Sequence, residues 1–152
     1  MRFAYCLVLF GLSLSLFGLS QAQSSLRSSL TQSCDSGSSE DCYKAGLLNL
    51  TGQDGAPKDY ARAHDQLSLA CEQAIAKACF SLATMYFNGE GVQKDYAIAR
   101  IHYKQACDGN QPEGCFFLGQ LYGHGAGGPK DMALFKQYVR KACAEGYELA
   151  CE

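Results

Sequence analysis

The 152-residue sequence contains no cluster of basic residues. Its 13 lysines and arginines are scattered among 15 acidic residues, and the formal net charge is -2. Domains that bind nucleic acid ordinarily carry a basic patch or stripe that neutralises phosphates. We therefore expect no nucleic-acid partner.

Motifs that activate a nucleophile or gather a metal ion are also missing. No serine is followed by lysine three positions later, and neither S-D-N nor K-T-G occurs. The three histidines are isolated, which argues against a set of converging zinc ligands. The stretches GEGVQKDY and GAGGPKDM lack the preceding strand and the following Lys-Ser/Thr of a phosphate-binding loop, so we interpret them as turns between helices. We expect no metal and no cofactor.

Long apolar runs are confined to the N-terminus. Arg2 is followed by an apolar run over residues 4–19 and by a small-x-small pattern that ends at Ala22. This order is typical of a secretory signal peptide. We expect residues 1–22 to be removed and residues 23–152 to form one domain that is secreted or periplasmic, with no membrane tether. A retained anchor is the alternative, but glycines and serines interrupt the run.

Cysteine, in contrast, is abundant. Eight of the nine cysteines follow the signal segment, and an even number in an oxidising compartment favours disulfides over metal sites. They form four pairs, each closed by seven residues. On a continuous helix such a pair would lie about 12 Å apart, beyond the roughly 7 Å between Cα atoms that a disulfide tolerates, so the chain must reverse within each pair. We predict the bridges Cys34–Cys42, Cys71–Cys79, Cys107–Cys115 and Cys143–Cys151.

The segments between the cysteine pairs repeat with a period of 36 residues, or 37 where one residue is inserted. Residues 79–107 align without a gap with residues 115–143, and residues 42–71 align with one extra residue in their glycine loop. A fixed period in this range indicates a stack of supersecondary units, none of which can bury its apolar face alone.

Each unit has the pattern of two helices. Apolar residues recur at helical spacing, as at Leu82, Met85 and Tyr86. A glycine suited to a C-terminal cap ends this first helix, and an aspartate suited to an N-cap opens a second helix that ends near the next cysteine. A small residue in the first helix predicts a close approach of two backbones. The cap glycines are Gly52, Gly89 and Gly125, the aspartates are Asp59, Asp95 and Asp131, and the small residues are Gly46, Ala83 and Gly119.

The repeated motif C-x-x-L-[AG]-x-x-Y-x-x-G-x-G-x-x-K-D, followed by an alanine and by a closing AC, resembles the Sel1-like repeat family. Within that family it is similar to the cysteine-rich secreted branch known from Helicobacter. The resemblance implies an all-α fold, a right-handed α/α superhelical solenoid of about three and a half helix pairs. A capping helix would open it around residues 25–34, and it would close just after Cys151. The departures from the motif are Ala45, Asn49 and Phe135.

The resemblance implies two functions from different classes. Sel1-like proteins act as scaffolds that bind peptides or proteins, whereas the cysteine-rich branch is associated with penicillin binding and carries a β-lactamase label. Because the serine and metal motifs of lactam hydrolysis are missing, we expect a monomeric scaffold for peptide, protein or peptidoglycan-like ligands. Weak hydrolysis of β-lactams is the alternative, and the catalytic residues for it are unknown.

A comparison of the units indicates where a ligand would bind. The residues two, five and nine positions after the cysteine of each first helix share one face and do not repeat in type. First helices usually line the concave side of such stacks, so we expect a groove there. Solvated variation without a binding role is the alternative. The candidates are Lys44, Leu47 and Thr51, then Ser81, Thr84 and Asn88, then Phe117, Gln120 and His124.

Overall fold

The computed structural model describes residues 26–151. These residues form helices joined by short turns, and no strand occurs among them. A helical segment over residues 26–35 comes first. The other helices are α2 (Ser39–Thr51), α3 (Tyr60–Glu72), α4 (Ala76–Asn88), α5 (Tyr96–Asp108), α6 (Pro112–His124) and α7 (Met132–Ala144), followed by the 3-10 turn η1 (Glu148–Ala150). The expected signal segment, residues 1–22, lies outside the described residues.

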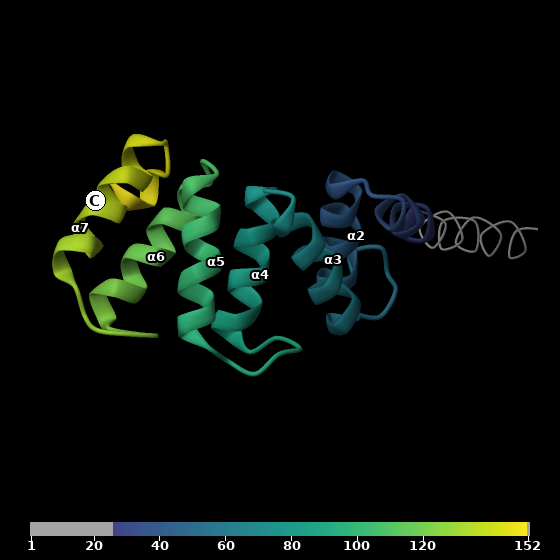
Figure 1. The fold of residues 1–152 in the computed structure, drawn as a ribbon, viewed down its shortest axis with the longest axis horizontal. Helices are drawn as coiled ribbons and strands as arrows, with labels where there is room; N and C mark the ends of the chain where they lie inside the picture. Colours follow the sequence, from purple (N-terminus) through teal and green to yellow (C-terminus); the bar gives the residue numbers. More distant parts are fainter. Residues whose placement is uncertain (1–25, 152) are drawn as a thin grey trace, which may run out of the picture.

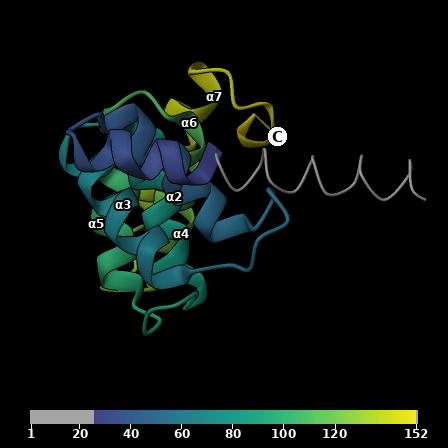
Figure 2. The same ribbon diagram turned by 90° about the vertical axis from the view of Figure 1, so that its right-hand side faces the viewer.

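The helices are stacked in chain order, which confirms the predicted all-α solenoid. Figure 1 shows that they follow one another along the long axis, so that residues 26–35 and η1 lie at opposite ends. The main contacts join each helix to the next one in the chain. Viewed along the stack, successive pairs lie one behind another but are displaced sideways, with α7 and η1 projecting to one side (Figure 2). None of the described helices is both long and apolar enough to cross a membrane.

The predicted helix ends are confirmed. α2, α4 and α6 each end at a glycine in the left-handed conformation, with φ of 67°, 78° and 70°. These are the glycines named as caps, and this φ is one that residues with a Cβ adopt only at a cost. At the start of α3, α5 and α7, an aspartate side chain accepts hydrogen bonds from backbone N–H groups of the first turn.

The four predicted disulfides are confirmed, with Cα–Cα separations of 4.5, 4.7, 4.5 and 4.9 Å. The first three join the end of one unit's second helix to the first turn of the next helix. In every bridge the chain reverses at the third residue after the leading cysteine, where φ is positive: 100° at Gly37, 62° at Ala74, 62° at Asn110 and 97° at Gly146. Ala74 is the unexpected member of this set, because an alanine Cβ disfavours this conformation.

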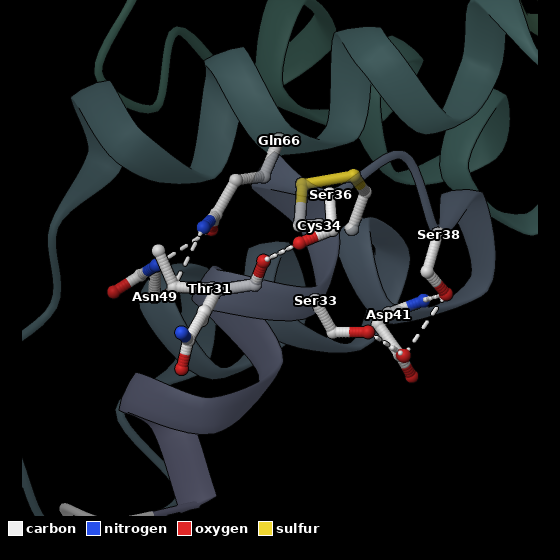
Figure 3. Close-up of a disulfide and its surroundings, with 10 residues drawn as sticks. Thr31, Ser33, Cys34, Ser36, Ser38, Asp41, Asn49 and Gln66 are labelled. Carbon is white, nitrogen blue, oxygen red and sulfur yellow. Dashed lines mark hydrogen bonds between the residues drawn. A yellow bond between two sulfur atoms is a disulfide. The ribbon is translucent and has the colours of Figure 1, made fainter.

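Two of the three positions that depart from the motif, Asn49 and Phe135, have local explanations. Asn49 is buried and donates a hydrogen bond from Nδ2 to Gln66 Oε1 at 2.7 Å, and Gln66 in turn reaches Thr31 Oγ1 at 3.3 Å (Figure 3). Three hydrogen-bonded polar side chains therefore take the place of the motif's tyrosine beside the first disulfide. Phe135 is accommodated by Gly123, since a Cβ there would lie 3.0 Å from the Phe135 ring.

Close packing of the two helices of a unit explains the small residues in the first helix. A Cβ on Gly46 would lie 2.8 Å from Leu67 Cγ, and one on Gly119 would lie 3.2 Å from the carbonyl oxygen of Phe135. The predicted close approach of backbones is confirmed at these two positions. The close contact joins the first and second helix of one unit, α2 with α3 and α6 with α7.

Candidate functional site

A hollow of about 390 Å³ lies between α4 and α6, the first helices of two consecutive units. We call it the aromatic groove. Its walls are mostly apolar, and the polar groups of its lining side chains are an amide, an imidazole and a phenol hydroxyl. The lining residues are Phe87, Tyr96, Phe117, Gln120, Leu121, His124 and Ala126.

The rings of the groove are held by one another. Phe87 and Tyr96 meet edge to face with their centroids 5.4 Å apart, and Phe117 stacks on Tyr103 at 5.5 Å. Edge-to-face and offset-stacked rings at these separations attract each other beyond the effect of area burial. The groove therefore has a preformed wall that a ligand does not have to order.

Tyr103 supports this wall from below. Only 1% of it is exposed, and burial raises the pKa of its hydroxyl to about 12. The hydroxyl lies 3.2 Å from Thr84 Oγ1, whose own contact with the carbonyl oxygen of Phe80 is 3.0 Å. The phenol is thus neutral and hydrogen-bonded beneath the Phe117 ring.

The structure brings together the predicted residues of the third unit, because Phe117, Gln120 and His124 all line the aromatic groove. In the second unit, Asn88 is exposed at the end of α4 and Thr84 lies beneath the groove wall. Ser81 is only 9% exposed and its hydroxyl donates to the carbonyl oxygen of Lys77, which places it in the core instead of on a ligand-facing surface.

The predicted residues of the first unit do not line the aromatic groove. Lys44 is exposed on α2, where its ammonium group lies 3.3 Å from the Asp41 carboxylate. Thr51 donates its hydroxyl to the carbonyl oxygen of Leu47. More than half of the lining residues were missed by the sequence pattern, because that pattern covers only three positions of each first helix. Phe87, Tyr96, Leu121 and Ala126 are the lining residues that it missed.

Two of the three histidines, which are far apart in the sequence, meet at Tyr86. His64 Nε2 lies 3.0 Å from the Tyr86 hydroxyl, and the His102 ring stacks on the Tyr86 ring at a centroid distance of 5.8 Å. Burial lowers the pKa of His102, and the hydrogen bond to Gln105 opposes that shift. Within residues 26–151 no group of three His, Cys, Asp or Glu side chains is placed to hold a metal ion.

A known repeat family matches the chain in three segments whose boundaries agree with those of the helix pairs. The Sel1 repeat model matches residues 39–74, 76–111 and 112–147, and each match contains one complete helix pair. The chain belongs to the Sel1 repeat family. The resemblance seen in the sequence motif is therefore confirmed, and each Sel1 repeat begins close to a bridge.

Solved Sel1 repeat structures share the fold. A Sel1 repeat protein from Oxalobacter formigenes is 31% identical with a TM-score of 0.72, over 81% of this chain and 92% of that one. Helicobacter pylori cysteine rich protein B is 26% identical with a TM-score of 0.69, over 87% of this chain and 94% of that one. The antigen c5321 from uropathogenic Escherichia coli, which displays an SLR fold, is 32% identical with a TM-score of 0.77.

Two of the relatives are much longer than the matched region. The chain covers 26% of c5321, while 82% of this chain is matched. Cytochrome c oxidase assembly factor 7 from Mus musculus is 36% identical over 78 residues, which is 47% of this chain and 33% of that protein. The Sel1 repeats thus occur both in proteins of about this length and as a part of larger ones.

Proposed function

We propose that this Sel1 repeat protein is a secreted or periplasmic scaffold that binds an extended peptide segment of a partner protein. An apolar side chain of that segment inserts into the aromatic groove. The observation that carries the proposal is the groove itself, a preformed apolar hollow between the first helices of two units. Its volume of about 390 Å³ falls within the range of sites for small groups.

The chemistry of the groove favours an apolar anchor with a polar backbone beside it. Burying one large apolar side chain contributes about 1.5–3 kcal/mol, and the rings that receive it are already packed. Gln120 at the wall offers both an amide donor and a carbonyl acceptor to the ligand backbone. Aromatic-lined grooves with a few polar groups are a common way to bind peptides.

The disulfides support the proposed location. Each bridge closes a turn between consecutive helices, and such bonds form and persist in oxidising compartments. The bridges also stiffen the stack without occupying the groove, since no cysteine lines it. Rigid units lower the entropic cost of ordering the surface on binding.

The test begins with linear peptides selected from a random phage-displayed library on the oxidised protein. Affinity of a selected peptide is then measured by calorimetry for Gln120→Trp, which fills the groove, and for His124→Ala. We expect at least a tenfold loss of affinity for Gln120→Trp with an unchanged helical signal. The matched control is Leu47→Trp, at the equivalent position of the first unit. Equal affinity for Gln120→Trp and the wild type would exclude the groove as the site.

A further inference from the structure

One position of the second helices carries an arginine that donates hydrogen bonds to the following glycine loop at two places in the stack. It lies seven residues before the cysteine that ends the helix, and it is occupied by Arg27 in the helical segment 26–35 and by Arg100 in α5. Arg100 donates from its guanidinium to the carbonyl oxygens of Leu121 at 2.9 Å and Pro129 at 3.3 Å. Each arginine therefore fastens the glycine loop of the following unit.

Arg27 makes the equivalent contacts in the first unit. Its guanidinium donates to the carbonyl oxygens of Leu48 at 3.0 Å and Pro57 at 3.2 Å, and it also pairs with the Asp54 carboxylate. Leu48 and Pro57 align with the two residues that Arg100 contacts. The same pair of backbone carbonyl oxygens therefore occurs in two units, and in each unit it accepts hydrogen bonds from an arginine of the protein itself.

The glycine loop of the middle unit faces a histidine, His64 of α3, where the loops of the other two units face an arginine. The acceptors at the equivalent positions are the carbonyl oxygens of Met85 and Gln93, but the shorter His64 side chain instead bonds to the Tyr86 hydroxyl. A hollow of about 440 Å³ is found there, which we call the His64 hollow. Its lining residues are His64, Tyr86, Val92, Gln93, Lys94, Asp95 and Ile98.

Tyr86 of the middle unit and Tyr122 of the third unit occupy the same repeat position, and each stacks on a ring of the second helix of its unit. In the third unit, the Arg100 guanidinium lies 4.3 Å over the Tyr122 ring, which stacks on Tyr138 at 5.8 Å. Tyr86 is the equivalent of Tyr122 and stacks on His102. Among the described residues no lysine or arginine side chain is placed over the Tyr86 ring, which lines the hollow. The His64 ring meets it edge to face at a centroid distance of 5.8 Å.

We propose that the His64 hollow binds the guanidinium group of an arginine side chain that a partner supplies. The ligand would take in the middle unit the place that Arg27 and Arg100 take in the others, with the carbonyl oxygen of Gln93, which lines the hollow, as an acceptor and Tyr86 as a stacking face. A guanidinium suits this site better than an ammonium because it is planar, has several donors and stacks on aromatic rings.

The neighbouring charges are compatible with this ligand. Lys94 lines the hollow, and its equivalents Lys58 and Lys130 directly follow the prolines whose carbonyl oxygens the internal arginines contact. The Asp65 carboxylate lies 3.4 Å from His64 Nδ1 and adds negative charge near the site. Asp95 caps α5 through bonds to the backbone N–H groups of Ala97 and Ile98, as the cap of α7 does in the third unit.

The probe for this site is Nα-acetyl-arginine amide, titrated into the oxidised, isotope-labelled protein and followed by amide chemical shifts. We expect saturable shifts at Tyr86, Gln93 and Lys94, with a dissociation constant on the order of millimolar. The citrulline analogue has the same shape without the charge, and we expect at least a tenfold weaker response to it. The His64→Gln variant, which keeps the hollow open, should respond as the wild type does.

The deciding variant is His64→Arg, which supplies the guanidinium internally. We expect it to abolish the response to the arginine probe and to raise the melting temperature. If it does not fold, Ile98→Phe fills the hollow from α5 and serves the same purpose. The groove variant Gln120→Trp should leave the response unchanged, which separates this inference from the proposed peptide groove. An equal response to citrulline, or a full response in the filled variants, would overturn the proposal.

Discussion

Removing a central disulfide should cost more stability than removing the last one. Each bridge spans eight positions, so the loop-entropy contribution is the same for both, about 2.5 kcal/mol. The difference comes from the folded state. Cys107 and Cys115 are fully buried and join the complete helices α5 and α6, whereas Cys151 is exposed and the last bridge joins α7 to one short turn.

Replacing both central cysteines by alanine removes two buried sulfur atoms in addition to the bridge. We expect Cys107→Ala/Cys115→Ala to lose about 3–4 kcal/mol, since the cavity adds roughly 1 kcal/mol to the loop term. The terminal pair, Cys143→Ala/Cys151→Ala, should lose less than about 2.5 kcal/mol because residues after α7 can open locally.

The measurement is thermal and urea unfolding of the two double variants under non-reducing conditions, followed by circular dichroism. The central variant should melt on the order of 10 °C below the wild type, and the terminal variant should fall clearly short of that loss. Equal losses would contradict the reasoning, because a one-dimensional stack depends more on links between complete units than on links at its end.

Three further predictions concern single side chains. Ala74→Gly should stabilise the protein by about 0.5–1 kcal/mol, because glycine relieves the left-handed φ of 62°, and urea unfolding will measure the gain; a loss would show that the alanine is unstrained. Asn49→Leu should cost about 1–3 kcal/mol by leaving the buried Gln66 amide without its partner, whereas Asn49→Leu with Gln66→Leu should recover part of that loss in the same assay. Burial in the folded state lowers the pKa of His102 from 6.5, so the folded protein binds this proton less readily than the unfolded chain does. Stability should therefore fall as the pH drops below about 6.5. The variant His102→Gln should flatten the slope of melting temperature against pH, and an unchanged slope would assign the pH dependence to other groups.

The sequence predicted the repeated features of the fold because they depend on local chemistry. The caps at Gly89 and Asp95 and the reversal within each cysteine pair follow from the conformations that single residues and short loops permit. The left-handed Ala74 was beyond this reasoning, since no residue type marks that turn and only tertiary context forces it.

The candidate site was predicted in part for a similar reason. Helical spacing identified Phe117, Gln120 and His124 as neighbours on one face. It did not identify Tyr96, which reaches the groove from the second helix and depends on how two helices cross. Nor did it show that Ser81, at the same repeat position as Phe117, is buried, because its exposure is set by the packing of the neighbouring unit.

Peptide binding in the aromatic groove is tested most directly by intermolecular nuclear Overhauser effects between a selected peptide and the groove. We predict contacts from one apolar side chain of the peptide to the ring protons of Phe87 and Phe117, and their loss in Gln120→Trp. Contacts that lie instead on α3 and α5, or that persist in the filled groove, would contradict the claim that this protein binds its ligand between α4 and α6.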